Sequence, residues 1–118
     1  MQNNTQLVQS KISEFRQLLD DKPQNITEEI CLHCRAIYGT LVQSLAWAAT
    51  PQESDELFKL IPDSLELIVE GQTILNEHVK THPADVTQRY LDSVTDKHDR
   101  LTKLQETRSL KHFVAERA

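Results

Sequence analysis

The chain has 118 residues, of which 38% are hydrophobic and 26% are charged, with only 2 Gly and 4 Pro. This length suits one domain, and the composition excludes collagen-like, low-complexity and wholly disordered proteins. Aromatic residues make up 5% of the chain and leucine is its commonest residue, which favours helices over a β-sandwich or barrel. We therefore expect a single all-α domain over residues 1–118.

Charge is spread unevenly around a net value of −5. Residues 1–96 hold seven Lys or Arg and fifteen Asp or Glu, whereas residues 97–118 hold six and three. Binding to a phosphate backbone needs a basic face that displaces counterions, so this acidic body argues against nucleic acid as a partner. The basic end is typical of a solvated helix C-terminus.

Compartment and membrane contact follow from three features. The N-terminus lacks the basic start and apolar run of a signal peptide. The longest uncharged stretch, Ala36 to Gln52, is too short and too polar to span a bilayer. The two cysteines, three residues apart, make no disulfide framework. We expect a cytoplasmic protein without a membrane partner.

The first predicted helix covers about Thr5 to Asp20 and ends before Pro23. Its apolar residues recur at helical spacing: Val8, Ile12, Phe15 and Leu19. A second helix is predicted to open at Asn25, whose side chain caps it while Glu28 reaches back. Its apolar face contains Ile30, Cys34, Ile37, Leu41, Leu45 and Ala48, widened by Cys31, Tyr38 and Val42. Because Ala36–Ala49 carries no charge, we expect this helix to be the most buried and central one.

The start of the third helix is the strongest local signal. Thr50 can cap it, Pro51 suits its first position, and Glu53 can return to the cap. Pro62 lacks an amide hydrogen and predicts a break there. The apolar stripe then continues through Ile61, Leu65, Ile68, Val69, Leu75 and Val79.

Pro83 ends the third helix and begins the last one, with Val86, Tyr90, Val94, Leu101 and Leu104 on one face. Short connections between these elements predict an antiparallel, mostly up-and-down bundle of four main helices, the third broken near Pro62. Gly39 and Gly71 fall inside predicted helices, where close helix crossing or a local bend would offset their cost.

Cysteine and histidine provide one candidate site. Cys31 and Cys34 flank His33 in a C-x-x-C pattern, which suggests a metal- or thiol-dependent site. The pattern supplies only part of a tetrahedral zinc site, and it lies inside a helix where the cysteines also suit the core. His78 and His82 have the i, i+4 spacing of two metal ligands. We predict no bound metal or cofactor.

Paired carboxylates provide another candidate. Glu53 and Glu56 form an E-x-x-E pattern, as in helical magnesium-dependent nucleotide hydrolases, but no E-x-x-D pattern follows. The acids between Glu53 and Glu77 also stand opposite Lys97, Arg100 and Lys103 if the last two helices pair. Because the predicted inner faces are Leu, Ile, Val and Ala, we expect no catalytic residues and no enzyme.

The remaining feature is residues 108–118, predicted to be either a frayed tail or a partner-binding segment. Leu110, Phe113 and Val114 form one apolar patch if this segment is helical, out of register with Leu101 and Leu104. Such a patch needs cover from a helix bend, a second copy or another protein. We expect a protein–protein binding function, as an adaptor, chaperone, immunity or regulatory protein, with a homodimer as one form.

Overall fold

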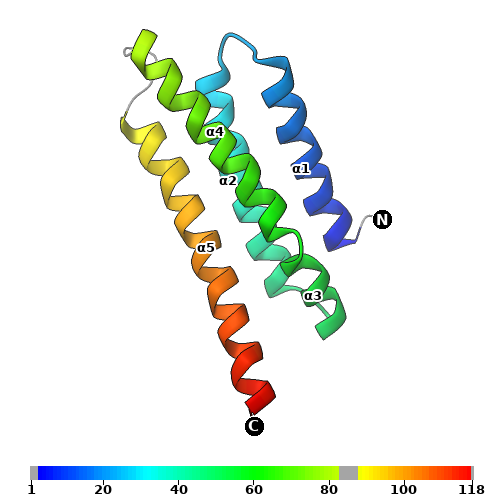
Figure 1. The fold of residues 1–118 in the computed structure, drawn as a ribbon. Coiled ribbons are helices and arrows are strands. Elements are labelled where there is room, and N and C mark those ends of the chain that lie inside the picture. The colour runs from blue at the N-terminus through cyan, green and yellow to red at the C-terminus, as the bar shows by residue number, and fades with distance from the viewer. Residues whose placement is uncertain (1–2, 83–87, 118) are drawn as a thin grey trace.

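The computed structural model describes residues 3–82 and 88–117, and for residues 108–117 it describes the backbone alone. The elements, in chain order, are α1 (Asn4–Asp21), α2 (Ile26–Ala46), α3 (Pro51–Phe58), α4 (Ile61–Thr81) and α5 (Gln88–Arg117) (Figure 1). The described residues contain no strand. The predicted all-α bundle is confirmed, including the break near Pro62, which lies in the first turn of α4.

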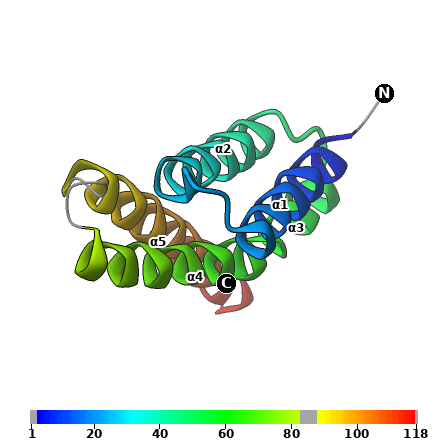
Figure 2. The same cartoon turned by 90° about the horizontal axis from the view of Figure 1, so that it is seen from above.

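The four long helices alternate in direction along the chain, as predicted, but their order around the bundle is α1, α2, α5, α4 (Figure 2). The short helix α3 packs beneath α1 and carries the chain across the lower end of the bundle (Figure 1). This crossing places α4 beside α1 and leaves α2 beside α5. As a result, α2 and α5 are parallel neighbours, whereas α4 and α5 are antiparallel.

The core is built from the apolar stripes of all four long helices. All four predicted stripe residues of α1 are buried. The fully buried large side chains also come from the other helices: Ile30, Ile37, Leu41, Leu57, Ile61, Leu67, Ile68, Leu75, Val94 and Leu101. Two predicted members are wrong: Val42 is 37% exposed and Val69 is 45% exposed. Val69 lines an open hollow between α4 and α5, so α5 covers it only in part.

At Gly71, α4 packs directly against side chains of α1 and α2. A Cβ atom on Gly71 would lie 2.9 Å from Cγ2 of Ile30 and 3.4 Å from Cζ of Phe15. Only a residue without a side chain fits there, so the helix-crossing explanation for this glycine is confirmed. Gly39 behaves differently, since nothing lies within 4 Å of its added Cβ.

Helix caps agree with the sequence at one of two predicted positions. The Thr50 hydroxyl accepts a hydrogen bond from the Glu53 amide at 3.1 Å, as predicted. The Glu53 side chain accepts from the Ala49 amide at 3.1 Å rather than from the predicted Thr50 amide, one residue further on. The predicted Asn25 cap is wrong, because its side chain makes no capping bond and its ψ of 31° is not extended. The side-chain amide of Asn25 instead donates a hydrogen bond to the Glu29 carboxylate at 3.3 Å.

The position of α2 also differs from the prediction. It contributes more buried residues than α1, α3 or α4, as predicted, but only three of them, Ile37, Leu41 and Ser44, lie in its uncharged part. It is not central, however, because it occupies one corner of the four-helix ring (Figure 2). A corner helix keeps an outward face, and absence of charge does not remove that face from solvent.

Two further predictions concern the α4–α5 connection and membrane insertion. Helix α4 ends at Thr81 with His82 as its C-cap, as expected, whereas Pro83 and Val86 lie outside the described residues. Among the helices described, none combines the length and apolarity needed to cross a membrane.

Candidate functional site

The C-x-x-C pair lies in the core. Cys34 is fully buried, Cys31 is 6% exposed, and both are free thiols. Burial raises the pKa of the Cys34 thiol far above its usual value, with a further contribution from Cys31. The nucleophilic thiolate form is therefore suppressed at Cys34. The prediction that both cysteines are buried is confirmed.

His33 turns away from the cysteines toward α1. Its ring meets Phe15 edge-on, with 5.6 Å between centroids and 74° between planes. Burial lowers the pKa of His33, although the Glu29 and Glu14 carboxylates act in the opposite direction. His33 therefore belongs to the α1–α2 packing. No group of three or more His, Cys, Asp or Glu side chains suited to a metal ion occurs in the described part of the chain.

A hollow of about 350 Å³ opens between α2 and α5 beside Cys31. Its walls include Glu28 and Arg35 from α2 and Arg89 from α5. It brings two guanidinium groups and one carboxylate to the same edge of the bundle. Every buried side-chain nitrogen or oxygen of the described residues has a hydrogen-bond partner, so no orphaned polar group points into this hollow.

The predicted pair of histidines, His78 and His82, lies at the C-terminal end of α4. The rings of His78 and His82 stack with 4.7 Å between centroids. Nδ1 of His82 lies 2.8 Å from the Thr81 hydroxyl oxygen. The stacking and the hydroxyl contact account for the position of His82 without a metal.

Glu53 and Glu56 join α3 to α1. The Asn4 side-chain amide donates to Glu53 at 2.9 Å, and the Thr5 hydroxyl donates to Glu56 at 3.5 Å. Glu53 also accepts a hydrogen bond from the Ala49 backbone amide, so both of its carboxylate oxygens form contacts at helix ends. The E-x-x-E pair thus holds the ends of two helices together.

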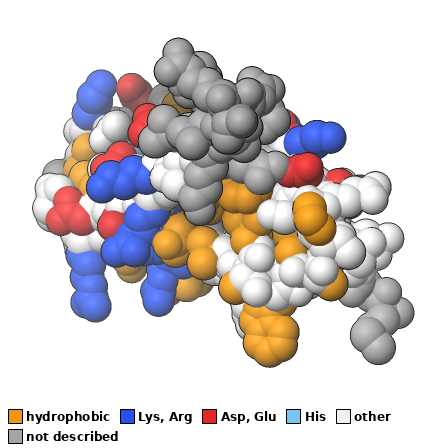
Figure 3. All heavy atoms as spheres, turned by 90° about the horizontal axis from the view of Figure 1, so that it is seen from below, with side chains coloured by type: hydrophobic (Ala, Val, Ile, Leu, Met, Phe, Trp, Pro, Cys, Tyr) orange, Lys and Arg blue, Asp and Glu red, His pale blue; other side chains and the backbone are white. Residues whose placement is uncertain are grey.

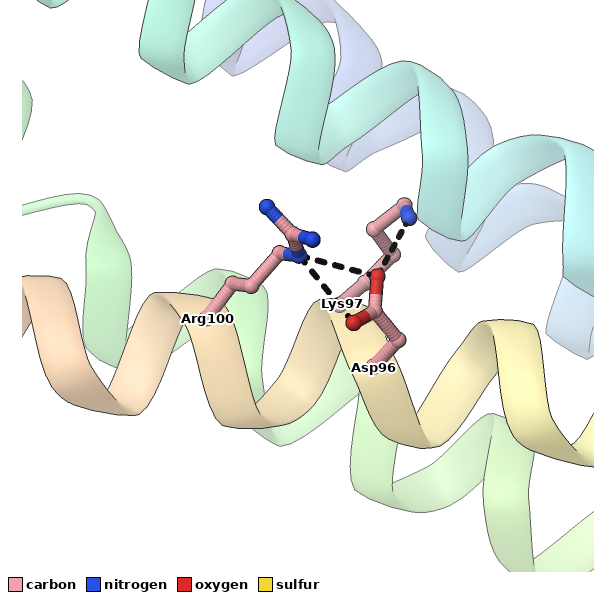
Figure 4. Close-up of polar contacts among 3 residues, drawn as sticks. All are labelled: Asp96, Lys97 and Arg100. Carbon is pink, nitrogen blue, oxygen red and sulfur yellow. Dashed lines mark hydrogen bonds and ion pairs between the residues drawn. The ribbon is translucent and has the colours of Figure 1, made fainter.

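A charged cluster lies on α5 (Figure 4). Asp96 accepts from Lys97 at 2.8 Å and from Arg100 at 3.0 Å. These hydrogen bonds, first from Lys97 and then from Arg100, hold the pKa of the Asp96 carboxyl below its usual value. Lys97 also lies 5.4 Å from the Tyr38 ring centroid, so the cluster connects α5 to α2.

This cluster bears on the expected pairing of acids in α4 with cations in α5. The two helices are antiparallel neighbours, as that expectation required. Lys97 and Arg100, however, bind Asp96 of their own helix and approach Tyr38 of α2. One observed α4–α5 contact is uncharged, from the Gln72 amide to the Thr95 hydroxyl at 3.4 Å.

One exposed face of α2 begins at the hollow between α2 and α5, which Leu32 and Arg35 line. We call it the α2 outer face, and it comprises Leu32, Arg35, Ala36, Gly39, Val42, Gln43 and Ala46, all exposed. Leu32 is 45% exposed, and Arg35 carries the only charge of this set. Uncharged side chains gather over one side of the lower end of the molecule, whereas Lys and Arg gather on the other side (Figure 3).

Trp47 adjoins the α2 outer face and is 75% exposed. It lines a hollow of about 340 Å³ together with Leu7 of α1 and Thr40 and Gln43 of α2. Leu7 is itself 39% exposed. Since α1 is uncharged up to Ser10 and α2 is uncharged from Ala36, their antiparallel packing joins two uncharged segments into one surface.

The predicted patch at Leu110, Phe113 and Val114 has a helical backbone, because α5 continues to Arg117. Its side chains lie outside the described residues, so its burial and contacts stay a prediction. The α2 outer face was missed because uncharged sequence was interpreted as buried sequence. Gly39 was the available signal of an exposed face. A glycine inside a helix lowers stability relative to alanine, and at Gly39 no close packing within the chain requires it.

Comparison with protein-family models, with curated proteins and with solved structures found no match to this chain. Its function is therefore inferred from its own residues and geometry.

Proposed function

We propose that this protein works by binding another protein molecule through the α2 outer face and the adjoining Trp47. The observation that carries the proposal is the exposure of large apolar side chains on a surface whose one charged residue is Arg35: Trp47 at 75%, Leu32 at 45% and Val42 at 37%. Interface cores are depleted in charge and enriched in aromatic residues, with Trp prominent among their hot spots.

The distribution of titratable groups also supports binding over catalysis. Groups with shifted pKa values occur at separate places: His33 against α1, Cys34 in the core, and Asp96 with Arg100 on α5. A catalytic site brings such groups together around a hollow. A non-enzymatic adaptor or regulator fits this dispersed arrangement, and two free buried thiols suit the reducing cytoplasm.

Site-specific photo-crosslinking in the native cell tests this function. A photoreactive amino acid replaces Val42 on the α2 outer face, and the control replaces Val69, a helical valine on α4 that is somewhat more exposed than Val42. We expect a discrete adduct with an identifiable protein at position 42 and not at 69. Equal adducts at both positions, or none at position 42, would contradict the proposal.

A further inference from the structure

The hollow between α2 and α5 differs in charge from other hollows of this protein. Its walls contain Arg35 of α2 and Arg89 of α5, and we call it the Arg35–Arg89 hollow. Three further hollows among the described residues have neither Lys nor Arg in their walls. Residues 1–96 hold seven Lys or Arg and fifteen Asp or Glu, so two arginines at one hollow are unusual in this acidic chain.

The fold brings the two arginines together from distant parts of the sequence. Helices α2 and α5 are parallel neighbours that both begin at the upper end of the bundle (Figure 1). Arg89 lies in the first turn of α5, and Arg35 lies near the third turn of α2. Because the helices run in the same direction, residues near their two beginnings line the same hollow.

Both guanidinium groups have donors available for a ligand. Arg35 and Arg89 are exposed. The ion pairs found among the described residues use other cations, namely Lys11, Lys80, Lys97, His98 and Arg100. Arg100 provides the contrast, because Asp96 accepts a hydrogen bond from it at 3.0 Å. A guanidinium carries five N–H donors and no acceptor, so the two arginines suit an anion.

The one carboxylate in these walls, Glu28, does not cancel the positive charge. Two arginines and one glutamate give the walls a formal charge of +1. Glu28 also lies in the first turn of α2, where the helix N-terminus stabilises a negative charge. The hollow therefore keeps a positive potential within an acidic protein.

The remaining walls suit a small organic molecule. Ser93 supplies a hydroxyl group, and Cys31, Leu32 and the ring of Tyr90 supply apolar surface. The volume of about 350 Å³ lies within the range of about 300–1,000 Å³ found for small-ligand sites. An anionic group can thus contact the arginines while an apolar body lies against the other walls.

From these features we infer that the Arg35–Arg89 hollow binds a phosphate group, either as the free ion or as the head of a small monoester. A phosphate dianion balances two guanidinium groups, and its oxygens match the paired N–H donors of arginine. A single carboxylate would balance only one of them. This ligand site goes beyond the proposed function, since Val42 and Trp47 do not line the hollow.

An NMR titration of the isotope-labelled full chain tests the inference, with inorganic phosphate, phenyl phosphate and acetate as probes at constant ionic strength. A pH of about 8 keeps the monoester, whose second pKa is about 6, as a dianion. Both phosphates should shift the backbone amide signals of Cys31, Arg89 and Ser93 until saturation, and acetate should bind more weakly. Tighter binding of phenyl phosphate would assign the site to a monoester, and equal affinity would assign it to the free ion.

Three variants and a control test the role of each charge. Arg35→Gln and Arg89→Gln should each weaken phosphate binding by about 10-fold or more, because each removes a charge-assisted hydrogen bond. Glu28→Gln should tighten it, because it removes the like charge. Arg16→Gln is the matched control, since Arg16 is an exposed arginine on α1, and it should leave the affinity unchanged.

Four results would overturn the inference: no saturable shift at the hollow, acetate bound as tightly as phosphate, an affinity insensitive to Arg35→Gln and Arg89→Gln, or equal weakening by Arg16→Gln. The last would indicate general attraction between phosphate and surface cations. Tightening by Glu28→Gln separates a direct charge effect from a loosened fold, because loss of structure would weaken binding. None of these results changes the outcome expected from photo-crosslinking at position 42.

Discussion

A Cβ atom on Gly71 would lie 2.9 Å from Cγ2 of Ile30, so α4 and α2 meet at a distance that only glycine permits. Gly39 sits in the same kind of helix interior with open space before it. The two glycines therefore offer a matched pair of substitutions with opposite expected effects on stability.

Gly71→Ala should lower the free energy of unfolding, because forcing a methyl group into a packed core costs about 1–3 kcal/mol. This cost outweighs the gain of roughly 0.5–1 kcal/mol from the better helix propensity of alanine. Gly39→Ala should raise the free energy of unfolding of the monomer by about that propensity gain. Urea unfolding at low protein concentration measures both, and a stabilised Gly71→Ala would contradict the close crossing.

Thr50→Ala should destabilise the protein by about 1 kcal/mol, because it removes the hydroxyl that accepts from the Glu53 amide. Asn25→Ala is the control: Asn25 occupies an N-cap position without a capping bond, so its loss should cost clearly less. Thermal or urea unfolding compares the two variants. Equal losses would indicate that Asn25 does cap α2 in solution.

Acidification should destabilise the protein partly through His33. Because the pKa of His33 is lowered in the folded state, the unfolded chain binds the proton more readily. The stabilising contribution is complete above the unfolded pKa of about 6.5 and is lost as pH falls toward the folded pKa. His33→Gln should therefore lose less stability than the unmodified chain between about pH 7.5 and 5.5 in urea unfolding. Equal losses in both proteins would rule out this role.

Cys34 should react with a thiol reagent far more slowly in the native protein than in denaturant, because it is fully buried and its raised pKa suppresses the thiolate. Cys31, 6% exposed beside the hollow between α2 and α5, should react before Cys34. Cys31→Ala and Cys34→Ala, measured separately, assign the two rates. Rapid native labelling of Cys34 would show that this part of the core opens readily.

The helices and most of their buried faces could be predicted from local sequence alone. The cap at Thr50, the break near Pro62 and the end of α4 before Pro83 are local effects of hydroxyl and proline geometry, so no tertiary information was needed. The stripe of α1 followed from helical periodicity, because an apolar face of this width must be buried somewhere. Asn25 shows the limit of local reasoning, since the turn before α2 sets a backbone angle that does not favour side-chain capping.

Which helices are neighbours, and which apolar residues stay exposed, depended on how the helices pack together. Amphipathic stripes of similar width can be arranged around a core in more than one order, and periodicity does not distinguish α5 from α4 as the second neighbour of α2. The corner position of α2 then left Val42 exposed although it flanks a buried stripe. The two helical glycines also differ only through packing. A Cβ atom at Gly71 would meet Ile30, whereas a Cβ atom at Gly39 would meet nothing within 4 Å.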